Sequence, residues 1–245
     1  MRAKVPAEAQ VPACLATRIL KVTPEEADLL CSKDARYRPL VEHFGLLSRE
    51  LFQDCYAGLV MTIVGQQLSD QVVGKLRQSM DPAFFTSPEA LIAACEHSLQ
   101  VLSTVPPKTP RAELAAQHIL PFSHNKIETL LRIARLFAEG SLSIAQLQNM
   151  DAAERERTLL SIKGVGPWSV SMIELMVFGE RDYFAIHDYG VQQGWAYLTG
   201  ADLKAMKPKE RLTALEQHAQ LVSPVGSAAN LYLWALKGVN GQMPE

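Results

Sequence analysis

The feature that most constrains this chain is a glycine-containing turn between two helical patterns, Ile162-Lys163-Gly164-Val165-Gly166-Pro167-Trp168. Two glycines one residue apart permit a tight turn and keep side chains away from the backbone amides. Proline favours the first position of a helix, so the second helix is predicted to begin at Pro167. The N–H groups and positive dipole end of that helix suit an anion such as phosphate, and Lys163 adds a point charge. A plain turn between two helices is the alternative interpretation.

Helical periodicity dominates the rest of the sequence. Leu51, Cys55, Leu59 and Ile63 recur at helical spacing, which predicts a deeply buried helix over 49–65. Further helix starts are predicted at Ser69, Ser87, Ser123, Asp151 and Pro208, and a last helix over 228–236. Residues 13–23 allow one short strand or an extended lead-in, and no alternating strand of useful length follows residue 25. The pattern predicts an all-α fold.

Composition limits the class of protein. The 245 residues, 48% of them hydrophobic, suffice for one sizeable domain or two small lobes. The four cysteines lie far apart without a C-x-x-C pair, which favours reduced thiols over a metal site. The sequence has no signal-peptide pattern and no apolar stretch that could span a membrane, so we expect a cytoplasmic protein.

The net charge of −2 does not by itself suggest a nucleic-acid partner. A duplex is attracted by a local positive face, to which Lys126, Arg132, Arg135 and Lys163 could contribute. Charges scattered over a solvated surface are an equally good interpretation.

A single carboxylate, Asp188, follows the glycine turn by about twenty residues. It comes after the aromatic–apolar stretch 183–186 and before a helical pattern through Val191, Trp195 and Leu198. An aspartate in that position caps a helix. Capping does not prevent the same side chain from taking part in chemistry.

Three motifs in this order, IVGQQLSDQVVGKL, IKGVGPW and AIHDYGVQQG, resemble the helix-hairpin-helix DNA glycosylase superfamily. The likeness is greatest to its alkylated-base branch, 3-methyladenine DNA glycosylase II, and covers roughly residues 50–240. It implies an all-α, two-lobed helical fold with the active-site cleft between the lobes. The segments expected are 1–49, an N-terminal part packing on the core; 50–200, the helix-hairpin-helix glycosylase core; and 201–245, C-terminal helices completing the first lobe.

The resemblance also implies contacts with DNA. The hairpin residues Lys163, Gly164, Val165, Gly166 and Ser169 would bind the DNA backbone. The turn formed by Gln66, Gln67, Leu68 and Ser69 would enter the duplex, with Gln67 filling the gap left by an everted base; an ordinary polar turn is the alternative. The hairpin carbonyls can also hold a monovalent cation, and no other cofactor or metal is expected.

Asp188 takes the place of the family's essential aspartate. Breaking an N-glycosidic bond develops positive charge on the sugar, and a carboxylate about 4 Å away attracts that charge by about 4 kcal/mol. This attraction corresponds to roughly a thousandfold in rate, and the same group could orient the attacking water. An alkylated purine is already cationic and leaves easily. His187 is expected to have a packing or backbone role.

Trp168 stands where the strand-cleaving members of the superfamily carry a nucleophilic lysine. An indole cannot form a Schiff base, so water should be the nucleophile and an abasic site the product. Trp168, with Met172 one turn later, would line the base pocket, unless it only packs in the core. At Pro224-Val225-Gly226-Ser227, relatives often show an aromatic residue and an arginine after the proline. The pocket is therefore expected to be more open.

These observations predict a monomeric, monofunctional DNA glycosylase that acts on double-stranded DNA containing alkylated bases of the 3-methyladenine and 7-methylguanine type in base excision repair. Such an enzyme would be nucleoid-associated in a bacterium and would have no membrane partner. The alternatives are an oxidised-base or mismatch glycosylase of the same fold, and a helix-hairpin-helix protein that binds DNA without catalysis.

Overall fold

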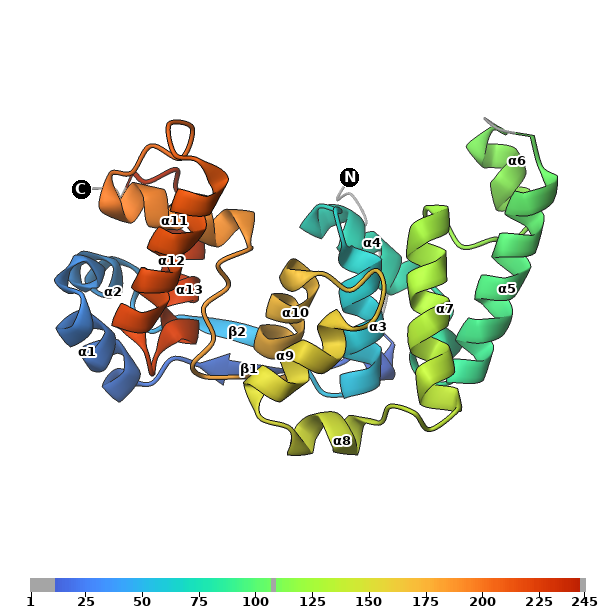
Figure 1. Cartoon of the computed structure of the whole chain (residues 1–245), viewed down its shortest axis with the longest axis horizontal. Helices are drawn as coiled ribbons and strands as arrows, with labels where there is room; N and C mark the ends of the chain where they lie inside the picture. Colours follow the sequence, from blue (N-terminus) through green and yellow to red (C-terminus); the bar gives the residue numbers. More distant parts are fainter. Residues whose placement is uncertain (1–11, 107–108, 243–245) are drawn as a thin grey trace, which may run out of the picture. The chain divides into compact units, whose positions relative to one another are not determined.

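The computed structural model describes residues 12–106 and 109–242, and helices dominate this part of the chain (Figure 1). The helices are α1 (Pro24–Lys33), α2 (Arg38–Phe44), α3 (Cys55–Gly65), α4 (Asp70–Ser79), α5 (Pro88–Thr104), α6 (Arg111–Ala116), α7 (His124–Ala138), α8 (Ile144–Asn149), α9 (Ala152–Leu160), α10 (Pro167–Ile173), α11 (Tyr189–Thr199), α12 (Pro208–Val222) and α13 (Gly226–Gly238). Strands β1 (Thr17–Lys21) and β2 (Ser48–Phe52) form a two-stranded sheet. The predicted helical fold is confirmed, with this small sheet added.

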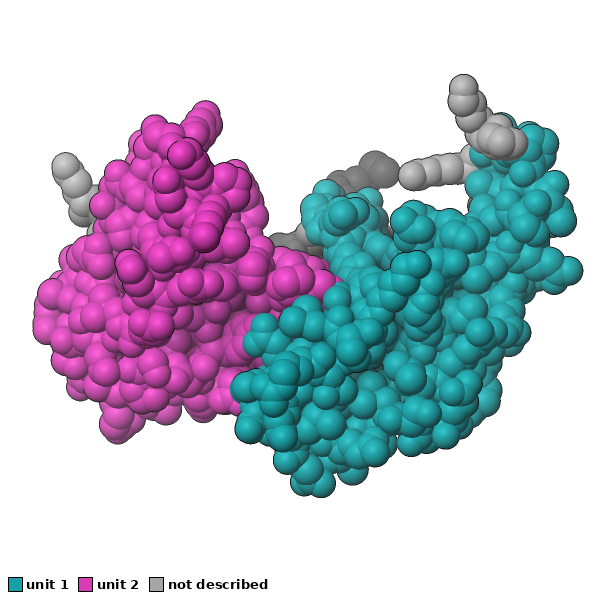
Figure 2. Space-filling view, in the orientation of Figure 1, with its two compact units in different colours: residues 1–17, 52–165 teal, residues 18–51, 166–245 magenta. Residues whose placement is uncertain are grey.

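The chain divides into two compact units, coloured separately in Figure 2. Unit 1 comprises residues 1–17 and 52–165, and unit 2 comprises residues 18–51 and 166–245. These divisions do not coincide with the predicted boundaries after residues 49 and 200. Residues 18–51 fold with the C-terminal helices, and residues 166–200 belong to that unit as well.

Helix α3 forms the centre of unit 1, since every residue from Tyr56 to Val64 is buried. Helices α5 and α7 pack along each other in the same unit. The side chains of Ser87, Ser123 and Asp151 each accept the N–H of the residue three positions further on. The helix starts predicted from these capping residues are therefore confirmed.

The helix predicted over 49–65 is wrong in its first part. Residues 48–52 form strand β2, and α3 begins at Cys55, where the Asp54 carboxylate accepts the N–H of Ala57. Two causes hide this strand in the sequence. Its partner β1 lies about thirty residues earlier, and the buried positions of its alternating pattern are Arg49 and Leu51, so that a charged residue occupies an inward position.

Unit 2 has its own core, to which α1, α2, α11, α12 and α13 contribute. Leu30, Tyr37, Leu215 and Tyr232 are fully buried in it. Helices α11 and α13 approach closely, because a Cβ atom on Gly194 would lie 2.1 Å from the carbonyl oxygen of Leu233. This close crossing fixes the middle of α11 against α13.

In residues 12–106 and 109–242, no helix is long and apolar enough to cross a membrane. The same residues contain no cluster of three His, Cys, Asp or Glu side chains suited to a metal ion. The four cysteines, Cys14, Cys31, Cys55 and Cys95, are free thiols, as predicted.

Candidate active site around Asp188

Asp188 is the N-cap residue of α11. Its Oδ1 accepts the N–H of Val191 at 2.9 Å, so the predicted capping role is confirmed. The residue is nevertheless partly exposed. The carboxylate therefore has a fixed position at the start of a helix, in a residue that is not fully buried.

Two tryptophans donate hydrogen bonds to this carboxylate. The Nε1–H of Trp168, on α10, donates to Oδ2 at 2.9 Å, and the Nε1–H of Trp234, on α13, donates to Oδ1 at 2.8 Å. Helices from three parts of unit 2 therefore hold one side chain. Sequence reasoning identified Asp188 and Trp168 but missed Trp234, whose contact spans 46 residues. The one feature of the sequence that could have drawn attention to Trp234 is that the chain has only three tryptophans.

Gly190 makes room for the second indole. A Cβ atom on this residue would lie 2.9 Å from Cδ1 and 3.1 Å from Nε1 of Trp234, and 3.0 Å from Oδ1 of Asp188. Real Cβ atoms essentially never lie within 3.0 Å of another atom, and the distances of 3.0 and 3.1 Å are also tighter than most real Cβ contacts. A larger residue would thus force the indole or the carboxylate to move.

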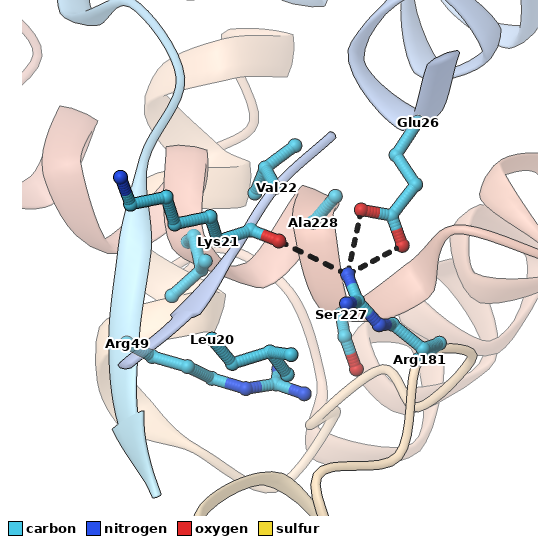
Figure 3. A pocket seen from close by; sticks show the side chains of 9 residues that line it. Leu20, Lys21, Val22, Glu26, Arg49, Arg181, Ser227 and Ala228 are labelled. Carbon is cyan, nitrogen blue, oxygen red and sulfur yellow. Dashed lines mark hydrogen bonds and ion pairs between the residues drawn. The ribbon is translucent and has the colours of Figure 1, made fainter. Parts of the chain in front are cut away.

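The segment that leads to Asp188 is anchored at its beginning by two arginines (Figure 3). Arg181 Nη1 donates to both carboxylate oxygens of Glu26, at 2.8 and 2.9 Å, and to the carbonyl of Lys21 at 3.1 Å. Arg49, 6% exposed, donates to the carbonyl of Glu180 at 2.7 Å. Burial, and next the like charge of Arg181, lower the pKa of Arg49 to about 10. These groups border a cavity of about 10 Å³, the room of one water molecule.

The start of α13 holds the middle of the same segment. Ser227 Oγ donates to the carbonyl of Glu180 at 2.6 Å, and Asn230 Nδ2 donates to the carbonyl of Tyr183 at 2.7 Å. Asn230 Oδ1 accepts the N–H of Ala185 at 3.1 Å. The loop that delivers Asp188 is therefore bonded along its length to residues more than forty positions away.

This packing explains the residues at Gly226 and Ser227. A Cβ atom on Gly226 would lie 3.2 Å from both Asp182 Oδ1 and the carbonyl carbon of Tyr183. A bulky residue would have to displace the loop. Gly226 thus allows the Asp188 loop to lie close to the start of α13, and the small side chain of Ser227 donates to that loop.

The remaining residues predicted for the base pocket and its helix have different degrees of exposure. Met172 is partly buried and packs against the core of unit 2. Ser169 is buried, with 2% of the residue exposed. His187 is exposed. Tyr189, which was not among the predicted site residues, follows Asp188 in the chain and is 68% exposed.

The glycine turn has the conformation that its sequence predicts. Gly164 has φ +99°, and a Cβ atom there would lie 1.9 Å from Oγ1 of Thr129 on α7. Val165 is buried and its N–H donates to the carbonyl of Ile162 at 2.9 Å. Gly166 is the N-cap residue of α10, and Lys163 is exposed. The first glycine is therefore needed for its conformation and for its contact with α7.

The predicted Gln66–Ser69 turn lies against this hairpin within unit 1. Gln66 Nε2 donates to the carbonyl of Gly164 at 3.1 Å. Leu68 N–H donates to the carbonyl of Gly65, and Gln66 has φ −49° and ψ 129°, which fits a type II turn. Gln67 then occupies the position that favours glycine, with φ +59°, and is exposed. Strain of this kind is concentrated at functional sites.

Ser69 stands at the N-cap position of α4 without a capping hydrogen bond from its side chain, contrary to the bond expected there. Leu68 is partly buried. The structure therefore brings the turn and the hairpin together, and fixes the turn through Gln66 rather than through Ser69.

Three of the four basic residues that could contribute to a positive face have hydrogen-bond or ion-pair partners within unit 1. Lys126 Nζ donates to the carbonyls of Val64 and Gln66, at 2.9 and 2.7 Å, and burial lowers its pKa. Arg132 pairs with Glu128 at 3.0 Å, and Arg135 pairs with Glu96 at 2.7 Å. Lys126 thus caps the end of α3, and acidic partners neutralise the two arginines.

Comparison with known proteins places these features in a family context, although no family model matches the chain. The chain is 26% identical over 198 residues to YfjP of Bacillus subtilis, provisionally named a DNA-3-methyladenine glycosylase. This match covers 80% of this chain and 67% of YfjP. The chain is 29% identical over 117 residues to DNA-3-methyladenine glycosylase 1 of Schizosaccharomyces pombe, which covers 46% and 48% of the two chains. The chain thus spans about half the length of the second relative.

Solved structures match over most of the chain. The S. pombe 3-methyladenine DNA glycosylase Mag1, in complex with abasic DNA, has a TM-score of 0.67 at 20% identity and covers 90% of this chain and 100% of its own. The 8-oxoguanine glycosylase/lyase of Clostridium acetobutylicum, with DNA, has a TM-score of 0.57 at 15% identity and covers 88% and 70%. The fold alone therefore does not distinguish between these two substrates.

The chain shares its fold with solved 3-methyladenine DNA glycosylases and is similar in sequence to proteins of that name, which supports the resemblance seen in the sequence. Both sequence relatives described above bear the name DNA-3-methyladenine glycosylase.

Proposed function

We propose that this protein is a monofunctional DNA glycosylase that hydrolyses the N-glycosidic bond of alkylated bases, of the 3-methyladenine and 7-methylguanine type, in double-stranded DNA. The observation that carries the proposal is the carboxylate of Asp188, held at the start of α11 by three N–H donors. The names of the relatives support an alkylated base as the substrate. The partner would be DNA, bound by a monomer with the target base flipped out.

Asp188 would stabilise the positive charge that develops on the deoxyribose as the bond breaks. At about 4 Å and an effective dielectric near 20, this attraction is about 4 kcal/mol, or roughly a thousandfold in rate. Because the three donors fix the carboxylate before the reaction, little reorganisation is needed when charge appears. The same group would orient the attacking water.

Trp168 would account for hydrolysis without strand cleavage. Its indole occupies the position of the lyase lysine and donates its N–H to Asp188, so no amine is available there to attack the sugar. Water would be the nucleophile and an abasic site the product. The face of the same indole would stack on the cationic base, with Met172 beside it.

The hairpin and the Gln66–Ser69 turn would bind the DNA itself. Gly164, Gly166 and Ser169 would contribute backbone N–H groups to a phosphate, with the exposed Lys163 as a nearby charge. The N–H of Val165 already serves the turn. Gln67, exposed at the tip of its strained turn, would fill the space of the everted base.

A monovalent cation at the hairpin carbonyls stays a prediction, and the contacts there weigh against it. The carbonyls of Ile162, Lys163 and Gly164 accept N–H groups from Val165, Arg132 and Gln66. A guanidinium beside this backbone would repel a second cation. No step of the reaction is assigned to such an ion.

The test is to incubate methylated DNA with the protein and to identify the released bases by chromatography. We expect free 3-methyladenine and 7-methylguanine, and alkali-labile abasic sites in the DNA. Asp188→Asn should lose most of the turnover and keep DNA binding, because asparagine still caps a helix. Asp202→Asn is a matched control, since Asp202 also accepts a local backbone N–H at the surface of unit 2.

Other outcomes would select other functions. Release of 8-oxoguanine or a mismatched base without methylated bases would identify the oxidised-base or mismatch activity. Duplex binding with no base release over a panel of lesions would identify a protein that only binds DNA. Full activity of Asp188→Asn would refute the mechanism even if the substrate is right.

A further inference from the structure

The hydrogen bonds at Asp188 distinguish its two oxygens. A carboxylate oxygen has two lone pairs that can accept. Oδ1 accepts from the N–H of Val191 and from the indole of Trp234, and Oδ2 accepts from the indole of Trp168. Counted over the residues that the structure describes, both lone pairs of Oδ1 are used and one lone pair of Oδ2 remains.

We infer that Trp234 is a positioning residue for Asp188, and that Oδ2 is the oxygen that faces the reacting sugar and water. The inference rests on the proposed function and deepens it. Trp234 holds Oδ1 against the start of α11, and Trp168 then limits the rotation of the carboxylate about its last bond. Oδ2 is thereby presented in one orientation.

The surroundings of Trp234 show that more than packing decides its position. Its side chain is only partly buried, so the indole N–H could have been left to solvent. Instead it lies 2.8 Å from a carboxylate oxygen, in a space that exists because residue 190 is glycine. Trp195, on the same helix as Gly190, is by contrast buried in the core of unit 2. Trp195 therefore provides a matched comparison.

Nuclear magnetic resonance can test the contact without any activity. The chain has three tryptophans and hence three indole N–H resonances, which single Trp→Phe variants assign. Asp188→Asn should shift the Trp168 and Trp234 resonances strongly and the Trp195 resonance least. An unmoved Trp234 resonance would overturn the inference.

Single-turnover kinetics tests the role. Trp234→Phe keeps an aromatic ring and removes the donor, so the rate of base release should fall by about tenfold or more, the effect of one hydrogen bond to a charged group. Affinity for DNA that contains an abasic site should change less than twofold, roughly within the error of such a measurement. Trp195→Phe should leave the rate per folded molecule unchanged, whatever it does to the melting temperature.

Gly190→Ala provides a second variant that keeps all three tryptophans. Its methyl group should displace the Trp234 indole and lower the rate, whereas Gly238→Ala on α13, where no atom lies within 4 Å of the added Cβ, should not. A wild-type rate in both Trp234→Phe and Gly190→Ala would overturn the inference while base release by the wild type upholds the proposed function. If the wild type releases no base, the proposed function fails, and the resonances still report whether Trp234 bonds Asp188.

Discussion

Replacing Gly164 by alanine tests whether the hairpin is fixed by its contact with α7. The backbone there has φ +99°, and the new Cβ would lie 1.9 Å from Oγ1, 2.8 Å from Cγ2 and 2.9 Å from Cβ of Thr129. The left-handed conformation costs about 1–2 kcal/mol for a residue with a Cβ. Overpacking against a buried side chain adds about 1–3 kcal/mol. We expect Gly164→Ala to lower the free energy of unfolding by roughly 2–5 kcal/mol.

Two other glycines separate these contributions in urea denaturation. Gly140 has φ +71° but nothing within 4 Å of an added Cβ, so Gly140→Ala should show only the conformational cost. Gly166 has neither a positive φ nor a close neighbour, and Gly166→Ala should cost less than about 1 kcal/mol. Thr129→Ala removes two of the three clashing atoms, so it should recover about 1–3 kcal/mol of the Gly164→Ala loss. If Gly164→Ala is no worse than Gly140→Ala, the hairpin does not contact α7 as described.

Three further predictions concern pH, the strained turn and the loop before Asp188. Burial lowers the pKa of His218 from 6.5 to about 4. As the pH falls, the unfolded state therefore binds a proton before the folded state does, and the free energy of unfolding should fall by about 3 kcal/mol between pH 6.5 and 4. His218→Gln should remove this pH dependence of stability. Gln67→Gly should raise the free energy of unfolding by about 1 kcal/mol because it relieves φ +59°, yet weaken base release, whereas Gln67→Ala should weaken release without raising stability. Asn230→Ala removes the acceptor of the buried Ala185 N–H and one of the donors to the carbonyl of Tyr183, so it should cost about 2–4 kcal/mol and lower the rate of base release.

Each of these has an outcome that would contradict it. An unchanged pH slope in His218→Gln would mean that this histidine is not buried uncharged. Equal stability of the Gln67→Gly and Gln67→Ala variants would mean that the turn is not strained. Wild-type stability of Asn230→Ala would mean that the loop does not depend on α13.

Local signals in the sequence were sufficient for the elements that carry the site. A capping residue and the backbone N–H that it binds lie only three residues apart, so the sequence alone can indicate the start of a helix. Ser87, Ser123 and Asp188 were identified correctly in this way. The same is true of the hairpin, whose glycine is required by its own backbone. Strand β2 was missed because its stability depends on a partner far away in the sequence.

The supports of the site could not be predicted for the same reason. The bonds from Trp234 to Asp188, from Asn230 to Tyr183 and from Arg49 to Glu180 each join residues between 46 and 131 positions apart. No pattern within a helix or a loop requires them. They become visible only when α13 and β2 are placed beside the loop in unit 2.

The contacts of Asp188 explain how a capping residue could serve the proposed catalysis. A helix N-cap needs one acceptor, and the bond from Val191 to Oδ1 satisfies that need. A carboxylate held by this bond alone could still rotate, and the two indoles remove that freedom. Each indole is uncharged and donates through a single N–H without accepting a proton. Neither indole can therefore form an ion pair with the carboxylate or exchange a proton with it. The donors therefore orient the negative charge without neutralising it, as the proposed stabilisation of a sugar cation would require.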